Sequence, residues 1–255
     1  MKTFNLTSIF LLASLLLSGC SVDHFSLFQS DAPAPVQVDH QKPASTHGDV
    51  SARKAAFFAS MKPVVMRENN RIRELREELY AIRALRHPGK AKLKLVARVA
   101  RDYQLELNGE PDAAFWQELL VRVDEVPLEM ALVQAANESA WGSSRFAREG
   151  NNYFGQWCFK KGCGLVPNQR AADATHEVRR FAGVDESVRA YMYNINTSGA
   201  YAEFRSIRHS LRVQSRPLDA ESLVYGLRSY SELGMTYVEM IRSMIRSNRE
   251  LIANS

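Results

Sequence analysis

Hydrophobic residues between positions 127 and 142 recur at helical spacing and predict one enclosed helix. Its apolar positions are Leu128, Met130, Ala131, Leu132, Val133, Ala135 and Ala136. Because they lie on both faces, we expect the helix to be buried on most sides. Pro127 suits the first helical position, and Trp141-Gly142 marks the predicted end.

The rest of the chain after residue 51 also has mainly helical spacing. One apolar stripe consists of Ile72, Leu75, Leu79 and Ile82. The pattern predicts helices over residues 52–86, 93–103, 112–123, 222–230 and 235–251, and another that begins at about residue 185. Residues 157–166 contain two glycines, two cysteines and aromatic residues, which is typical of a short β-hairpin. The sequence therefore predicts a mainly α protein with a small β-hairpin lobe.

The N-terminus has the pattern of an export signal. Lys2 precedes an apolar run over residues 10–17, which is too short for a stable membrane span. The run ends in Leu17-Ser18-Gly19-Cys20, which is typical of a bacterial lipoprotein signal that is removed to leave a lipidated Cys20. Ser21 replaces the aspartate that would favour the inner membrane. We therefore expect a lipid anchor on the periplasmic side of the outer membrane; the alternative is plain secretion.

Residues 20–51 form a second compositional segment, poor in apolar residues and rich in Asp, Pro, Ala, Gln, Ser and His. This composition predicts a disordered tether, with a reach of roughly 30–35 Å. The alternative is filler with no mechanical role. The expected organisation is a signal peptide over residues 1–19, the tether over 20–51, a helical N-terminal region over 52–113 and a main domain over 114–255.

The net charge of the chain indicates which kinds of polymer it can bind. The formal net charge is +5, and removal of Lys2 with the signal peptide leaves +4. A mild positive charge suits an anionic wall polymer. No basic and aromatic motif accompanies it, so nucleic-acid binding is not expected. The six histidines are scattered without ligand spacing, and we expect neither a metal nor a cofactor.

Cys158 and Cys163 flank the sequence FKKG in the predicted hairpin. The cell envelope is oxidising, which favours a disulfide across this turn. The alternative is a pair of free buried thiols.

Glu138 ends the predicted buried helix, where the helix dipole disfavours a negative charge. Desolvation acts in the same direction, so this position favours a protonated carboxyl. Such a group is what glycoside hydrolysis needs to protonate the leaving oxygen. The alternative is that Glu138 lies just past the helix and points into water.

Three blocks carry a resemblance to a known family. They read VPLEMALVQAANESAWGSSRFAREGNNYFGQWCFKKGCGLVP, FAGVDESVRAYMYNINTSGAYAEFR and LRSYSELGMTYVEMIRSMI. The chain resembles the bacterial Bax family, which is unrelated to the apoptosis regulator and has a glucosaminidase domain of the glycoside hydrolase family 73 type. The resemblance implies a lysozyme-like fold, with a helical domain and a small β-lobe flanking a substrate groove. It also implies cleavage of peptidoglycan at N-acetylglucosamine.

The resemblance also implies roles for individual residues. Glu138 matches the family's catalytic acid, and Tyr230 matches a tyrosine near the reacting sugar. Glu177 is the nearest match to a second acid on the β-lobe. The family element beside the groove is matched by Asn152, Tyr153, Phe154 and Gly155.

Each of these residues also has a plain structural interpretation. Trp141 either lines the groove or fills the core beneath it, and Phe154 is more typical of packing. Asn152 either bonds an N-acetyl group or forms a turn. The Tyr230 hydroxyl either acts on the acetamido group or caps a helix.

The second half of the mechanism stays open. A retaining enzyme needs a carboxylate roughly 5 Å from the acid, and an inverting one about 6.5–9.5 Å. Glu177 and Asp173 are the lobe acids, and either fits a solvated loop carboxylate. A third route uses the substrate's acetamido oxygen as nucleophile.

Two other functions compete with a glucosaminidase. A lytic transglycosylase also uses a glutamate in a Glu-Ser motif, but typically carries Gly-Leu-Met-Gln downstream where this chain has Asn-Tyr-Phe-Gly-Gln. A non-catalytic peptidoglycan-binding lipoprotein would keep the fold alone. An amidase label is sometimes attached to such domains, but neither a nucleophile nor a zinc site supports it here.

Overall fold

The computed structural model describes residues 47–168, 170 and 174–255. The N-terminal signal, Cys20 and most of the expected tether lie outside these residues, as does Asp173. In chain order the elements are α1 (His47–Arg83), α2 (Lys90–Asp102), α3 (Ala113–Arg122), α4 (Leu128–Glu138), α5 (Arg145–Gly150), β1 (Trp157–Cys158), β2 (Gly164–Leu165), β3 (Glu177–Arg179), α6 (Val184–Thr197), η2 (Gly199–Tyr201), α7 (Ala202–Val213), α8 (Ala220–Leu223), η3 (Val224–Leu227) and α9 (Met235–Ala253). The protein is mainly helical, as predicted.

Helix α4 forms the centre of the core. Every residue from Met130 to Ala136 is buried, which confirms the enclosed helix that the sequence predicts. Helices α1 and α9 both pack against it. The helix ends at Glu138, a little before the predicted Trp141-Gly142.

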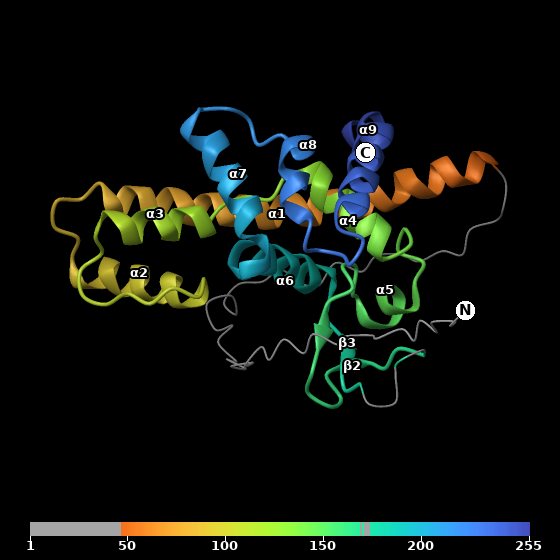
Figure 1. The fold of residues 1–255 in the computed structure, drawn as a ribbon, viewed down its shortest axis with the longest axis horizontal. Coiled ribbons are helices and arrows are strands. Elements are labelled where there is room, and N and C mark those ends of the chain that lie inside the picture. Colours follow the sequence, from red (N-terminus) through yellow and green to blue (C-terminus); the bar gives the residue numbers. More distant parts are fainter. Residues whose placement is uncertain (1–46, 169, 171–173) are drawn as a thin grey trace, which may run out of the picture.

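Helix α1 runs along the length of the molecule (Figure 1). It contacts α4, α6 and α9, and its predicted stripe is buried at Ile72, Leu79 and Ile82. Lys62 Nζ donates hydrogen bonds to the carbonyls of Ile252 at 2.8 Å and Ser255 at 2.7 Å. A cation at a helix C-terminus satisfies carbonyls that have no partner within the helix. Helices α1 and α9 are thus joined directly.

The β-lobe is a three-stranded antiparallel sheet, so the predicted simple hairpin is wrong in its topology. The strand order is β1-β3-β2, and Val178 of the central strand lies opposite both Trp157 and Leu165. The turn between β1 and β2 is closed by the predicted disulfide between Cys158 and Cys163. Because a third segment supplies the central strand, spacing within residues 157–166 alone did not reveal the pairing.

Two helices that the pattern did not predict are α5 and α7. Helix α5 is too short to show a period. Helix α7 buries Arg205 and Arg208 on its inner face, so its apolar pattern is interrupted. The predicted helix over 222–230 is a short α8 followed by the 3-10 turn η3. Gly226 in η3 lies against α7, and a Cβ there would stand 2.3 Å from Phe204 Cα.

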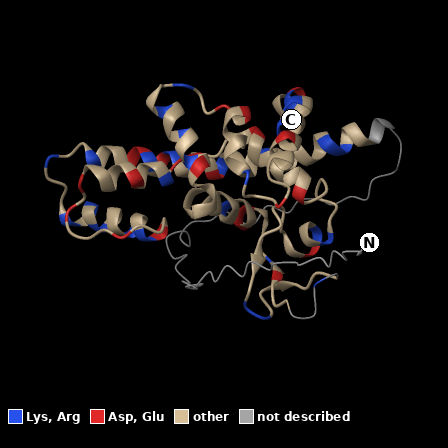
Figure 2. Cartoon of the chain, viewed as in Figure 1, with Lys and Arg blue, Asp and Glu red and all other residues tan. Residues whose placement is uncertain are grey.

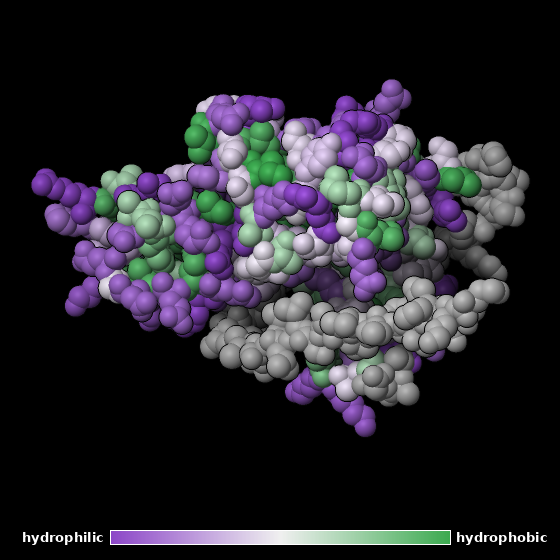
Figure 3. Space-filling model, in the orientation of Figure 1, coloured by the Kyte–Doolittle hydropathy of each residue, from purple (hydrophilic) through white to green (hydrophobic). Residues whose placement is uncertain are grey.

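Within the described residues, no helix is both long and apolar enough to cross a membrane. On the face drawn in Figure 3, the hydrophobic residues among those described lie in small patches that hydrophilic residues separate.

Candidate active site

Glu138 lies where α4 ends and the chain turns sharply. The three residues Ala140, Trp141 and Gly142 have φ values of +51°, +58° and +76°. Ser139 fixes this turn, because its hydroxyl donates to the Ala135 carbonyl at 2.6 Å and accepts from the Gly142 N–H at 2.8 Å. Consecutive left-handed residues that are not all glycine need such support and are typical of functional sites.

The two carboxyl oxygens of Glu138 have different surroundings. Oε1 accepts hydrogen bonds from the Tyr237 hydroxyl and from Asn137 Nδ2, each at 3.0 Å. Oε2 faces Gly155, where a Cβ would stand 3.8 Å away. Gly155 is exposed and Glu138 is half-buried. One oxygen is therefore held by the protein while the other lies beside an exposed backbone position.

Four tyrosines interact with the charge of this carboxyl. The rings of Tyr230 and Tyr237 stack, with centroids 5.3 Å apart. Burial first, with the charge of Glu138 among the further causes, raises the pKa of Tyr191, Tyr230 and Tyr237 well above the ordinary value. The same two causes raise the pKa of Tyr201 to about 12, against a hydrogen bond from Asn194. All four phenols therefore keep their protons at neutral pH.

Tyr230 is brought next to the predicted groove element. Its hydroxyl donates to the Phe154 carbonyl at 3.2 Å, and its ring stacks on Tyr237 rather than contacting the Glu138 carboxyl through a hydrogen bond. Tyr230 is half-buried. Tyr230 therefore contacts Tyr237, and Tyr237 makes the hydrogen bond to the acid.

The predicted binding residues of the Asn152 element are mostly used inside the protein. Asn152 Nδ2 donates to the carbonyls of Gln156 and Arg179, both at 2.8 Å, and its oxygen accepts from the Gln156 N–H at 3.1 Å. Tyr153 is fully buried, and Phe154 stacks on Tyr191 at 4.0 Å. These contacts fit the turn and packing interpretations. They hold Gly155 against Glu138.

Trp141 packs on the helix α1. Its ring lies edge-on to Phe57 at 5.8 Å and to Phe58 at 5.3 Å, and Lys54 Nζ lies 4.8 Å from its centroid. This is the core interpretation of Trp141.

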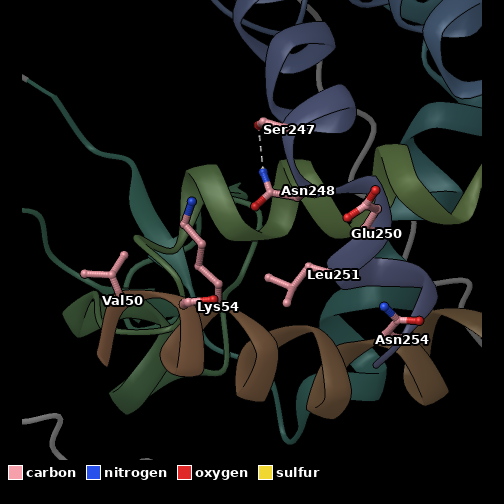
Figure 4. Close-up of a pocket in the computed structure, with 8 residues that line it drawn as sticks. Val50, Lys54, Ser247, Asn248, Glu250, Leu251 and Asn254 are labelled. Carbon is pink, nitrogen blue, oxygen red and sulfur yellow. Dashed lines mark hydrogen bonds between the residues drawn. The ribbon is translucent and has the colours of Figure 1, made fainter. Parts of the chain in front are cut away.

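Lys54 also lines a cavity of about 540 Å³ between the start of α1 and the end of α9, shown in Figure 4. Glu138 does not line it.

Glu177 supports the β-lobe. Its two carboxyl oxygens accept from the N–H groups of Gly162 at 2.9 Å and Gly164 at 2.8 Å. These two backbone hydrogen bonds lower the pKa of Glu177. The side chain lies next to Cys158 and Cys163, but their sulfur atoms share a disulfide and offer no thiolate to a metal. None of the hydrogen bonds among the described residues joins Glu177 to Glu138.

Sequence reasoning missed Tyr237 and the position of Trp157. Tyr237 lies seven residues after Tyr230, in the third block that resembles the family. Its place in that block was the feature of the sequence that could have indicated a role. Trp157 lies two residues after Gly155, is 58% exposed and stacks on His176 with centroids 4.2 Å apart.

Comparison with known proteins identifies the family of the chain. The family model described as Mannosyl-glycoprotein endo-beta-N-acetylglucosaminidase matches residues 113–250, which include both Glu138 and Tyr237. Protein bax of Escherichia coli (strain K12) is 33% identical over 201 residues, covering 79% of this chain and 72% of that protein. No solved structure gave a significant match. The chain therefore belongs to the glucosaminidase family, as a Bax-family protein with a glucosaminidase domain.

Proposed function

We propose that this protein is a glycosidase that cleaves the glycan strand of peptidoglycan at N-acetylglucosamine, with Glu138 as the general acid. The observation that carries the proposal is the asymmetric carboxyl of Glu138. Its Oε1 is held by Tyr237 and Asn137, whereas Oε2 faces the exposed Gly155. A carboxyl that protonates a leaving oxygen needs one fixed side and one side open to substrate.

In the proposed reaction, Glu138 gives its proton to the glycosidic oxygen as the bond from that oxygen to the sugar carbon breaks. The bond's electron pair stays with the leaving oxygen. The acetamido oxygen of the substrate attacks the sugar carbon and closes a ring with it. Water then attacks the same carbon, and the bond from that carbon to the acetamido oxygen breaks. The Glu138 carboxylate takes a proton from this water, which restores the acid. We favour this route because both Glu177 oxygens already accept backbone N–H groups of the lobe.

The substrate class rests on two further arguments. The matching family is described by an N-acetylglucosaminidase activity on glycoproteins, which supports N-acetylglucosamine as the sugar at the cleaved bond. The expected export signal with Cys20 would bring the chain to peptidoglycan. Its positive charge suits an anionic polymer.

The β-lobe offers a second point of contact for a glycan. Trp157 and Phe159 are 58% and 72% exposed, and they stand two residues apart beside the disulfide. The turn between β1 and β2 also carries Lys160 and Lys161, and Figure 2 draws this turn in blue. Two extended residues span at most about 7 Å, so Trp157 starts close to Gly155. We include Trp157 in the proposal as a platform for a sugar ring.

Replacing Trp157 by alanine is expected to raise KM for peptidoglycan fragments about fivefold with little change in kcat. The reason is the loss of about 1 kcal/mol of ring contact made in both the bound ground state and the transition state. Steady-state kinetics on soluble glycan fragments checks this. Tyr80→Ala removes another exposed aromatic ring, on α1, and should leave KM unchanged. An unchanged KM in Trp157→Ala would remove the platform from the proposal.

The function itself is tested by offering the purified chain two polymers, peptidoglycan sacculi and a glycoprotein carrying N-linked glycans. Release of soluble fragments from sacculi alone is the expected result. Cleavage of the glycoprotein alone would transfer the assignment to that substrate. Binding to sacculi without any release would favour the non-catalytic alternative.

We also propose that Cys20 carries the lipid anchor, with residues 20–46 as the tether to the outer membrane. Residues 47–51 of the expected tether belong to helix α1 instead. Mass spectrometry of the mature N-terminal peptide is expected to find a lipid-modified Cys20 and no residue before it. An N-terminal peptide that begins elsewhere and has no added mass on Cys20 would contradict the anchor. The reason for the expectation is the sequence Leu17-Ser18-Gly19-Cys20 after an apolar run.

A further inference from the structure

A chain of buried hydrogen bonds leads to the Glu138 carboxyl from the interior of the helical domain. The Tyr191 hydroxyl donates to Gln134 Oε1 at 2.5 Å, and Gln134 Nε2 donates to the Tyr237 hydroxyl at 3.0 Å. The Tyr237 hydroxyl in turn donates to Glu138 Oε1 at 3.0 Å. Gln134, Tyr191 and Tyr237 are at most 2% exposed. The chain joins α6, α4 and α9.

The chemistry of Gln134 gives this chain a direction. An amide nitrogen only donates and an amide oxygen only accepts. Because Gln134 Nε2 donates to the Tyr237 oxygen, the single Tyr237 proton is free for Glu138. The opposite amide orientation would place the Gln134 oxygen against Tyr237 and draw that proton away. The observed orientation therefore makes Tyr237 a donor to Oε1.

The consequence is a difference between the two Glu138 oxygens. Oε1 accepts from both Tyr237 and Asn137, so a proton on that oxygen would face two donors. Oε2 is the oxygen beside Gly155. We propose that Gln134 and Tyr237 are positioning residues that keep the acid proton of Glu138 on Oε2, directed at the substrate. This inference rests on the proposed role of Glu138.

The groups that face Glu138 do not compete for this proton. Tyr191 comes from α6, Tyr201 from η2, Tyr230 from the segment after η3 and Tyr237 from α9. All are phenols that stay protonated at neutral pH. The direction of the chain is therefore the same whether Glu138 is protonated or ionised.

Tyr237→Phe tests the proposal, because it removes the donor and keeps the ring that stacks on Tyr230. A hydrogen bond to a charged group contributes about 1.5–3 kcal/mol, so we expect kcat to fall roughly 10- to 100-fold with KM little changed. The high-pH limb of the kcat profile should move to higher pH, because the ionised acid has lost a donor. A residue with a merely structural role would not move that limb.

Gln134→Glu provides a second variant that leaves every Glu138 contact atom in place. A glutamate carboxylate at position 134 would accept from Tyr237 and turn its hydroxyl away from Glu138. We expect a loss of kcat comparable with that of Tyr237→Phe. Thermal unfolding accompanies each assay, since this change buries a carboxyl. Tyr103→Phe removes a buried hydroxyl on the end of α2, outside the site, and should behave as the parent chain.

The outcomes separate the two claims when Glu138→Gln is assayed beside these variants. If Glu138→Gln is inactive while Tyr237→Phe keeps the parent kcat and pH profile, the positioning role is overturned and the proposed function stands. If Glu138→Gln is fully active, both are overturned. If Tyr237→Phe and Gln134→Glu both have a lower kcat, and the high-pH limb of the kcat profile moves in Tyr237→Phe, the positioning role is supported.

Discussion

Replacing Glu138 by glutamine is expected to lower the rate of glycan cleavage by roughly 10²- to 10⁴-fold, because general acid catalysis contributes about that much. The change keeps the size of the side chain. The glutamine carbonyl can still accept from Tyr237 and Asn137, as Oε1 does now. Its amide group would take the place of Oε2 beside Gly155 and has no proton of suitable acidity. Rates on peptidoglycan with matched thermal unfolding curves check the prediction.

Glu129→Gln is the matched control for that experiment. Glu129 lies in the first turn of the same helix, whereas Glu138 is its last residue. We expect Glu129→Gln to retain the parent rate. A Glu138→Gln chain that folds normally and cleaves at the parent rate would refute the role of Glu138 as the acid.

Arg208→Met is expected to lower the free energy of unfolding by about 3–5 kcal/mol, because it leaves a buried carboxylate short of a partner. Arg208 is fully buried and lies 3.7 Å from Asp124, which is also buried. It donates to the carbonyls of Val121 and Glu125, each at 2.8 Å, and to Asn196 Oδ1 at 2.7 Å. Burial lowers the pKa of Arg208 to about 10, against the opposing charge of Asp124, so the group is charged at neutral pH.

Urea denaturation at pH 7 measures this loss. Arg228→Met is the control, because the Arg228–Glu203 pair is exposed on both sides and such pairs contribute about 0–1 kcal/mol. Equal losses in the two variants would show that the buried network around Asp124 does not stabilise the fold.

The same network predicts how stability depends on acid. Burial alone would raise the pKa of Asp124, but Arg208, Arg212 and Arg76 outweigh it and hold that pKa below its ordinary value of 3.8. The unfolded chain therefore binds this proton first as the pH falls. The contribution of Asp124 is complete above about pH 4 and is lost as the pH falls through its lower folded value. In Arg208→Met the folded pKa of Asp124 should lie closer to its unfolded value, so urea denaturation at a series of acidic pH values should show a smaller acid-dependent loss of stability than in the parent chain.

Much of the helical framework was predictable from local pattern. Helices α1, α3 and α9 have apolar stripes that depend only on neighbouring turns. Helix α7 was not predictable in this way, because its inner face buries the charged Arg208 against Asp124 and the carbonyls of another segment. The sheet order was also missed. Its central strand at Glu177–Arg179 is remote in sequence from the turn it stabilises.

The candidate site, like the fold, was predictable from local sequence only in part. Glu138 stood out because one helix places an acid at the end of an apolar run. Its partner Tyr237 lies 99 residues later, on α9, and only packing of α9 against α4 brings the two together. The roles of Asn152 and Phe154 depend on which backbone groups surround them, which local sequence does not specify.

The most direct test of the central claim is the chemistry of the ends that the enzyme makes. Purified peptidoglycan is digested with the purified chain, and the fragments are identified by mass spectrometry before and after borohydride reduction. We predict reducing N-acetylglucosamine ends, absent from the digest with Glu138→Gln. Anhydro-muramic ends would contradict the glucosaminidase assignment and indicate a lytic transglycosylase.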